Sequence, residues 1–210
     1  MHSPGPTHTP DPQDGGRLAI FIAVLLGLAA IVTAFSAYKN ELRNHEALIK
    51  FNQGVVRSNQ ASQSYTQGSQ VRSQDGALFL EFAKAANANQ QGVSAYIHDT
   101  LMSPTLRKSV DWWSNTKDSV DSPFVPQDPY YKISQNVKGD ALTVESRKDF
   151  KEAKHEQNVS DEYTLVTVIL ASALFLLGIA GVSSRQSIKI GAVSAGGLIF
   201  LIALIVLVTI

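Results

Sequence analysis

Three uninterrupted apolar stretches dominate the pattern of hydrophobic and polar positions along the chain. Each is 20 or 21 residues long and lacks Asp, Glu, Lys, Arg and His: Leu18–Tyr38, Tyr163–Val182 and Ile190–Ile210. A hydrocarbon core about 30 Å thick needs roughly 20 helical residues to span it, and backbone amides in lipid must bond within their own helix. The pattern therefore predicts an all-α membrane protein with transmembrane helices at residues 17–38, 163–182 and 190–210.

The first apolar run also fits a secretory signal peptide, because Arg17 precedes it and Ala34-Phe35-Ser36 offers the small residues of a cleavage site. The apolar core of a signal peptide is about 7–15 residues long, and this run is longer. Its helical pattern also continues past the site. We therefore expect an uncleaved anchor, preceded at residues 1–16 by a disordered tail with four prolines and three glycines.

The polar segment between the first two runs, residues 39–162, keeps a helical periodicity and is expected to lie in water. We predict that the first two transmembrane helices extend into an antiparallel, coiled-coil-like stalk with arms at about 39–75 and 130–162. Spacings of three and four place the seam of the stalk on Leu48, Phe51, Val55, Ser58, Ser62, Tyr65 and Ser69 in one arm, and on Ile133, Val137, Ala141, Val144, Phe150 and Ala153 in the other.

A small helical cap is expected between the arms, at about residues 77–128. One continuous apolar helix face is predicted there from Leu78, Phe79, Phe82, Ala86, Val93, Tyr96, Ile97 and Leu101. Ser103-Pro104 is typical of a helix N-cap followed by proline at the first helical position. The three prolines of residues 122–129 forbid a continuous helix, so an extended turn is expected.

Charge in the only short loop gives the orientation. Residues 183–189 carry Arg185 and Lys189 and no acid, which places this loop in the cytoplasm together with Arg17. The N-terminus is then cytoplasmic and residues 39–162 are extracytoplasmic. The basic residues Lys39, Arg43 and Lys50 oppose this orientation, but they belong to a long domain, whose charge has little influence on topology.

Overall charge and cysteine content exclude several functions. Residues 39–162 hold 15 basic and 16 acidic side chains, a net charge of −1, which gives no basic surface for nucleic acid. The chain has no cysteine, so it has neither disulfides nor thiolate metal sites. No cofactor is expected. No GxSxG, HExxH, GxxxxGK or Rossmann motif occurs either, and we expect no enzymatic activity.

Counting outward from the predicted membrane surface sets two groups of side chains at equal heights in the stalk. Lys39 or Arg43 should face Asp161 or Glu162, as ion pairs that mark the register. His45 comes level with His155, a pair that could hold a metal or sense pH, although no third ligand is evident and solvated imidazoles are the simpler interpretation. The same simple interpretation applies to His98, next to Asp99.

Four aromatic residues of the cap form a candidate binding patch: Trp112, Trp113, Phe124 and Tyr130. Aromatic rings favour stacking on a sugar or a peptide. Packing is the more common outcome, in which one of two adjacent tryptophans enters the core and the other partly covers it.

The predicted membrane helices contain no ionisable group, which argues against pumps and proton-coupled carriers. They carry stripes of small residues that allow close helix packing: Ala19, Ala23, Gly27, Ala30 and Ala34 in the first helix, and Gly191, Ala192, Ala195 and Gly196 in the third. Packing within one chain is the simpler interpretation; self-association or partner docking is the alternative.

The order of these parts resembles small, uncharacterised bacterial inner-membrane proteins that have one anchor helix, a polar helical insert and a terminal two-helix hairpin with a basic turn. The resemblance lies in AIFIAVLLGLAAIVTAFSAYKNELRNHEA and YTLVTVILASALFLLGIAGVSSRQSIKI. It is a likeness of topology, and it implies a bacterial inner membrane but no site residues.

Three functional classes follow. The leading hypothesis is a non-enzymatic structural or interaction component of the cell envelope, with the lipid bilayer and either a second copy or an envelope protein as partners. One alternative is a small oligomeric channel or transporter accessory subunit, with a path lined by Thr33, Ser36, Thr167, Ser172 and Ser194. The other is an envelope ligand sensor or enzyme that acts at the cap.

Overall fold

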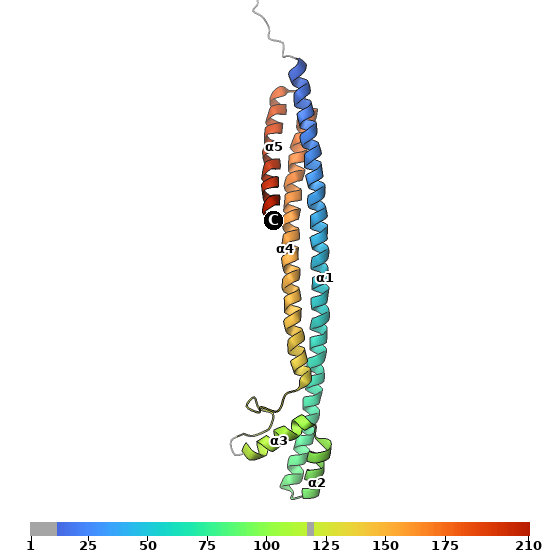
Figure 1. Cartoon of the computed structure of the whole chain (residues 1–210), viewed down its shortest axis with the longest axis vertical. Coiled ribbons are helices and arrows are strands. Elements are labelled where there is room, and N and C mark those ends of the chain that lie inside the picture. Colours follow the sequence, from blue (N-terminus) through green and yellow to red (C-terminus); the bar gives the residue numbers. More distant parts are fainter. Residues whose placement is uncertain (1–11, 117–119) are drawn as a thin grey trace, which may run out of the picture. The chain divides into compact units, whose positions relative to one another are not determined.

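The computed structural model describes residues 12–116 and 120–210, and every regular element within these ranges is a helix (Figure 1). The elements are α1 (Pro12–Asn87), α2 (Gln91–Tyr96), the π-helical turn η1 (Ile97–Leu101), α3 (Pro104–Thr116), α4 (Ser134–Val182) and α5 (Gln186–Thr209). The predicted all-α class is therefore confirmed. Of the expected disordered tail, residues 1–11 lie outside the described residues, and α1 begins at Pro12.

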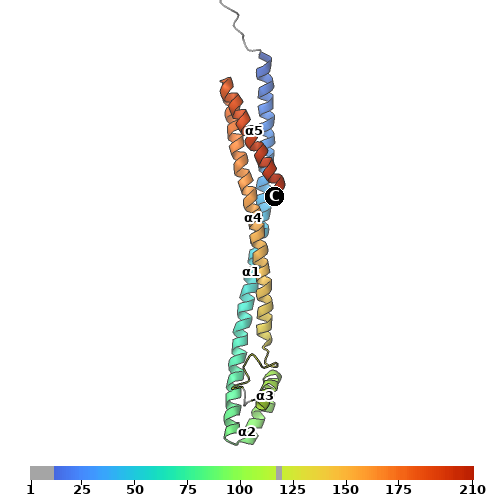
Figure 2. The ribbon, with the colours of Figure 1, turned by 90° about the vertical axis from the view of Figure 1, so that its left-hand side faces the viewer.

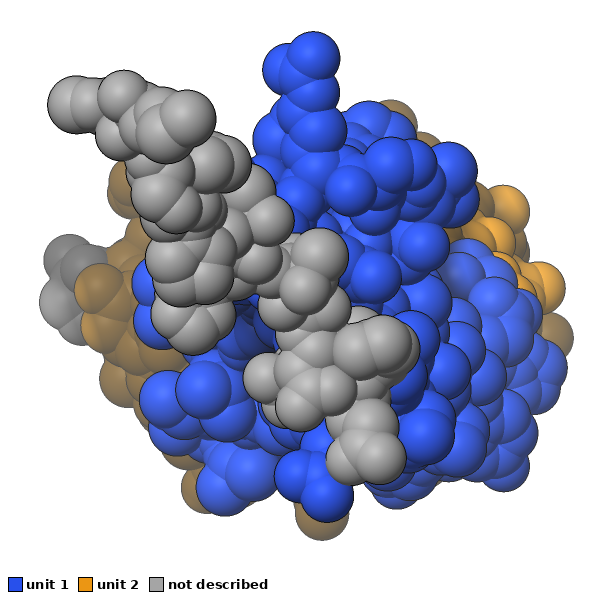
Figure 3. All heavy atoms as spheres, turned by 90° about the horizontal axis from the view of Figure 1, so that it is seen from above, with its two compact units in different colours: residues 1–50, 151–210 blue, residues 51–150 orange. Residues whose placement is uncertain are grey.

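Helices α1, α4 and α5 are each long and apolar enough, by length and composition, to cross a membrane. They contain the three apolar runs found in the sequence. The turn between α4 and α5 is shorter than the predicted loop, because α5 already begins at Gln186 and the Lys189 amide donates to the Arg185 carbonyl at 3.0 Å. By its contacts the chain divides into two compact units, unit 1 (residues 1–50 and 151–210) and unit 2 (residues 51–150), which Figure 3 shows in separate colours.

In unit 1 the apolar parts of α1, α4 and α5 lie side by side (Figures 1 and 2). All three helices contribute to one buried cluster of Ala29, Val166, Leu170, Ala173, Phe200 and Ala203. The closest approach is at Gly196 of α5, where an added Cβ atom would lie 3.0 Å from Leu177 Cγ and 3.2 Å from the Ala173 carbonyl oxygen. Gly196 therefore lets the backbones of α4 and α5 come together.

Most of the small residues predicted to pack the membrane helices do not do so within this chain. Ala23, Gly27, Ala30, Gly191 and Ala195 are all exposed. Within its apolar run, residues 18–38, α1 buries Ile22, Ala29 and Ser36, which recur every seven positions. Among the residues of the two predicted stripes, all of which the structure describes, Gly196 alone is buried. A stripe defined by residue size alone thus missed the buried face of α1.

In unit 2, α1 and α4 pack through small side chains. The buried residues are Gly54, Ala61, Ser64 and Gly68 on α1, and Gly139, Ser146 and Asp149 on α4. Two of the glycines lie under aromatic rings: an added Cβ would approach the Phe150 ring to 2.9 Å at Gly54 and the Tyr65 ring to 2.8 Å at Gly139. The small residues therefore allow close helix packing, with a ring from the other helix filling the space that each of these glycines leaves.

The predicted seam of the first arm is displaced by one residue at five of its seven positions, whereas the predicted Phe51 does contact α4, with its ring 5.5 Å from that of Phe150. The structure buries Ala47, Gly54, Ala61, Ser64 and Gly68, whereas the prediction chose the residues that follow them: Leu48, Val55, Ser62, Tyr65 and Ser69. In the second arm the prediction holds for Ile133, which lies just before α4, and for Ala153 on α4, because both are buried. It fails for Val137, Ala141 and Val144, which are exposed. The prediction favoured large apolar residues, but the helices meet where side chains are small enough for their backbones to approach.

The cap begins where α1 ends. Asn89 adopts a left-handed conformation with φ of 59°, and the Gln90 amide donates to the Ala85 carbonyl at 2.9 Å, so the chain turns before α2. This turn interrupts the predicted continuous apolar face, and Val93, Tyr96 and Leu101 are exposed. The predicted N-cap is confirmed, because the Leu106 amide donates to Ser103 Oγ at 3.1 Å and α3 starts at Pro104.

The cap has its own apolar core. Ile97, Met102, Leu106 and Val110 are buried, and the partly buried Leu78, Phe79, Phe82, Phe124 and Tyr131 pack around them. Residues 120–133, which contain the three prolines, form no helix, as predicted. Two aromatic residues of this segment, Phe124 and Tyr131, pack against the core of the cap.

Candidate functional site

The candidate aromatic patch separates into a packed half and an open half. The Trp113 ring lies edge-on to Phe79 at a centroid distance of 5.1 Å, and its indole Nε1 donates to the Val120 carbonyl at 3.0 Å. Phe124 lies edge-on to the same Phe79 ring at 5.6 Å and to Tyr131 at 4.9 Å. Trp113 and Phe124 therefore belong to the core of the cap rather than to a binding surface.

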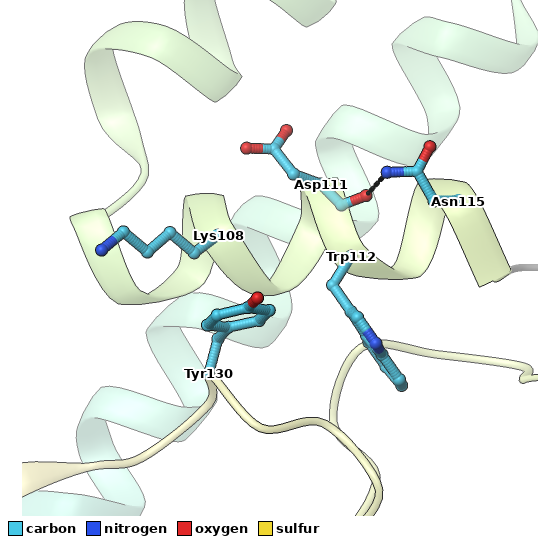
Figure 4. Close-up of a pocket in the computed structure, with 5 residues that line it drawn as sticks. All are labelled: Lys108, Asp111, Trp112, Asn115 and Tyr130. Atoms are coloured by element: carbon cyan, nitrogen blue, oxygen red, sulfur yellow. Dashed lines mark hydrogen bonds between the residues drawn. The ribbon is translucent and has the colours of Figure 1, made fainter.

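Trp112 and Tyr130 instead line an open recess of about 400 Å³ on the surface of the cap (Figure 4). The remaining lining residues are Lys108, Asp111 and Asn115, all on α3. Tyr130 is 50% exposed and comes from the segment before α4. In Figure 4 the Trp112 side chain projects from α3 toward the side from which Tyr130 approaches on its own segment, and both residues line the recess. We call these five residues the cap recess.

Sequence reasoning found the two rings of the cap recess but missed its polar residues. Lys108 and Trp112 are four positions apart, as are Asp111 and Asn115, so each pair shares a helix face. The Asn115 Nδ2 donates to the Asp111 carbonyl oxygen at 2.9 Å, which fixes the amide at the rim of the cap recess. The i, i+4 spacing was the signal that could have identified these residues.

His98 bridges two carboxylates next to the cap recess. Its Nδ1 lies 2.7 Å from Asp99 Oδ1 and its Nε2 lies 2.9 Å from Asp111 Oδ1. The imidazole side chain is only 20% exposed and its ring lies 5.9 Å from that of Phe82. His98 sits in the π-helical turn η1, so this contact ties η1 to α3. The prediction of a solvated imidazole at His98 is therefore wrong, because the ring bridges two carboxylates.

A buried acid lies beneath the aromatic core of the cap. Asp75 on α1 is buried and accepts a hydrogen bond from the Tyr131 hydroxyl at 3.0 Å. Burial raises the pKa of the Asp75 carboxyl, and the hydrogen bond from Tyr131 opposes this shift only in part. Burial likewise raises the pKa of the Tyr131 hydroxyl, and its hydrogen bond to Asp75 adds to that increase. The pair therefore holds the segment before α4 to α1.

Ion pairs connect α1 and α4 within each unit. In unit 1 Arg43 Nη1 lies 2.9 Å from Glu156 Oε2 and 3.3 Å from Glu46 Oε2, and Lys50 Nζ lies 2.7 Å from Glu152 Oε2. The hydrogen bond to Glu156 raises the pKa of the Arg43 guanidinium. In unit 2 Arg57 pairs with the buried Asp149 and, at 3.3 Å, with Glu145.

The predicted ion pairs at the base of the stalk find different partners. Arg43 contacts Glu156 instead of Asp161 or Glu162, while Lys39 Nζ lies 5.8 Å from the centroid of the Phe35 ring. Asp161 accepts from the Gln157 side chain at 3.0 Å. The register of α1 against α4 is nevertheless close to the predicted one. Ser160, next to Asp161, bonds to Asn40, next to Lys39, and donates to its carbonyl oxygen at 3.3 Å. Residues at equal height on α1 and α4 therefore meet only where both lie on or beside the faces that the two helices turn toward each other.

The two histidines of the stalk, His45 and His155, are both exposed. Each lies two positions from a buried alanine, Ala47 or Ala153, and hence on the far side of its helix from the contact. Within residues 12–116 and 120–210 no group of three or more His, Asp or Glu side chains is arranged to hold a metal ion.

The hydroxyls proposed to line a channel bond to helix backbone. Thr33, Thr167 and Ser172 each donate to the carbonyl four residues earlier, at 2.7, 2.9 and 3.1 Å. Ser36 is fully buried and donates across to the Tyr163 carbonyl at 3.1 Å. Ser194 is exposed. Such bonds are typical of hydroxyl groups in apolar helices, which donate to a carbonyl of their own helix or of a packed neighbour.

None of the described residues covers one apolar surface of unit 2. Val137, Ala141 and Val144 recur at spacings of four and three, and they form a stripe on α4 that we call the α4 stripe. Val137 is 58% exposed and Val144 is 66% exposed. Lys138, Arg147 and Lys148 flank it. It spans two turns of a helix whose other face packs on α1.

Comparison with known proteins adds no family. No family model matches the chain, and no curated protein or solved structure matches it significantly.

Proposed function

We propose that the chain is a multi-pass membrane protein of the cell envelope that acts as an interaction component and not as an enzyme. Residues 17–38, 163–182 and 190–210 span the bilayer, with the N-terminus in the cytoplasm and residues 39–162 outside it. Helices α1 and α4 continue beyond the membrane as an antiparallel stalk that carries the cap. The partner is a second copy of the chain or another envelope protein.

The α4 stripe is the observation that carries this proposal. The valines of the α4 stripe lie on the face of α4 that does not pack on α1. Because they are exposed in the monomer, they add no hydrophobic stabilisation to it. Contiguous apolar surface with a polar rim is typical of protein–protein contact sites. Lys138, Arg147 and Lys148 provide such a rim around the valines. Contact with a partner would remove the stripe from water.

The register of α1 and α4 supports the stalk. In unit 2 partners pair as Gly54 with Ser146 and as Tyr65 with Asp140, so residue numbers fall on α4 as they rise on α1. In unit 1 the same order is seen for Ser36 with Tyr163 and Arg43 with Glu156. Polar contacts of this kind suit a segment in water, whereas hydrocarbon would penalise the charged ones.

Disulfide trapping in native membranes tests the proposal, because the chain has no cysteine and each introduced one is unique. We expect Val144→Cys to give an oxidation-dependent adduct that holds either a second copy or one recurrent protein. Asn59→Cys is the control, because Asn59 is exposed on α1, two positions before the buried Ala61 and so on the side away from α4, and it should give markedly less. Equal trapping at both positions, or none at Val144, would rule out the α4 stripe as the contact surface.

A further inference from the structure

The cap recess is a built site that the interaction proposal does not use. It lies on different residues from the α4 stripe, and its volume of about 400 Å³ falls within the range of about 300–1,000 Å³ typical of small-molecule sites. Its two rings come from segments separated along the chain, Trp112 from α3 and Tyr130 from the segment before α4. The packed Trp113 and the N-capped start of α3 hold the wall that carries Trp112.

The charges in the cap recess cancel. Lys108 supplies one positive charge and Asp111 one negative charge. The Asp111 carboxylate has one oxygen held by His98, at 2.9 Å from Nε2. Lys108 opposes a cationic ligand that would otherwise lie on the rings, and Asp111 opposes an anionic one. A neutral ligand therefore meets no net charge.

The hydrogen-bonding groups of the cap recess are mixed and open. Within the described residues, the side chains of Lys108, Trp112 and Tyr130 make no hydrogen bond, and Asn115 uses only its Nδ2. The lysine ammonium and the indole donate, the Asn115 Oδ1 accepts, and the tyrosine hydroxyl does both. A ligand that both donates and accepts around an apolar face would satisfy this set.

We infer that the cap recess binds a neutral saccharide between Trp112 and Tyr130. The C–H groups of a pyranose face carry partial positive charge and pack against the negative face of an aromatic ring. The hydroxyls around the sugar edge both donate and accept, which matches Lys108, Asn115 and the free oxygen of Asp111. Trp112 and Tyr130 supply the apolar contact, and the three polar residues set the orientation.

Intrinsic fluorescence of the full-length protein tests the inference, since the chain has only two tryptophans and Trp113 is packed against Phe79. The protein is purified in a detergent without a sugar headgroup and titrated with N-acetylglucosamine and with glucose. We expect a saturable change in Trp112 emission with one of these sugars. Tyr130→Ala should weaken the apparent affinity about tenfold by removing one stacking ring.

The matched control is Tyr96→Ala, because Tyr96 is an equally exposed tyrosine of the cap outside the recess. It should leave the apparent affinity within about twofold. Far-UV circular dichroism checks that both variants are helical. Benzoate and tetramethylammonium serve as charged probes. The inference is overturned if neither sugar saturates, if Tyr130→Ala binds like the unaltered chain, or if a charged probe binds more tightly than both sugars.

Discussion

The Ser146 hydroxyl on α4 donates a hydrogen bond of 2.8 Å to the main-chain carbonyl oxygen of Gly54 on α1, at a point where both residues are buried. The carbonyl oxygen has a second lone pair, so it can accept this bond and also the bond of its own helix. A Cβ at Gly54 would lie 2.9 Å from the Phe150 ring, so the missing side chain allows α1 and α4 to approach closely here. The contact fixes the level at which α1 and α4 meet in unit 2.

Replacement of Ser146 by Ala should lower the stability of unit 2 by about 0.5–1.5 kcal/mol. The loss is modest because the Gly54 carbonyl keeps its helical partner and no buried group is left unpaired. Urea unfolding of the purified protein, followed by far-UV circular dichroism, measures it. Ser62→Ala is the control, since Ser62 is exposed on α1 and gains the same helix propensity. Equal midpoints for the two variants would contradict the role given to the bond.

Two glycines of α1 should respond in opposite directions to alanine. An alanine at Gly76 meets nothing within 4 Å and should stabilise α1 by about 0.5–1 kcal/mol through helix propensity. At Gly54 the added Cβ would lie 2.9 Å from the Phe150 ring, and the forced shift should cost about 1–3 kcal/mol. The same urea unfolding measures both. A Gly54→Ala variant at least as stable as Gly76→Ala would show that the helices do not approach closely there.

Asp75 should make the stability of the cap depend on pH. Burial raises its pKa above the ordinary 3.8, so the folded protein holds the neutral acid more readily than the unfolded chain does. The stabilising contribution of Asp75 is therefore complete below that ordinary pKa and is lost as the pH rises through the raised value. Asp75→Asn cannot ionise, and its stability relative to the unaltered chain should increase between about pH 4 and about pH 7.

Melting temperatures across that pH range measure the effect of Asp75→Asn. The exposed Asp121→Asn serves as the control for the loss of one carboxylate. A relative stability of Asp75→Asn that falls with rising pH would reverse the sign and refute the assignment.

Length and hydropathy were enough to predict the helical class and the apolar helices, because an apolar run of about 20 residues leaves few alternatives. The N-cap at Ser103 was also predictable, since its signal is local. The face that each helix buries against its neighbour was not predictable. Large apolar residues such as Leu48 and Val137 dominate the hydrophobic pattern, but in unit 2 α1 packs on α4 mainly through glycine, alanine and serine, which contribute little to such a pattern.

The cap shows the same limit at the level of a site. The sequence predicted that one of two adjacent tryptophans packs, but which one does depends on Phe79, which is 34 positions before Trp113 in the chain. The bridge from His98 to Asp111 depends likewise on the break between η1 and α3, where Met102 adopts an extended conformation. Contacts between distant segments decide the site, and a single sequence does not contain them.

Accessibility of single cysteines most directly tests whether the apolar helices lie in a membrane. Val168 is 59% exposed within the chain, so only lipid would shield a cysteine placed there. Ser69→Cys and Ser184→Cys, both exposed, report on the proposed outer domain and inner loop. With a membrane-impermeant maleimide on intact cells, we expect labelling at Ser69 alone, labelling at Ser184 after permeabilisation, and none at Val168 without detergent. Reaction of Val168→Cys as readily as Ser69→Cys in intact membranes would contradict the account.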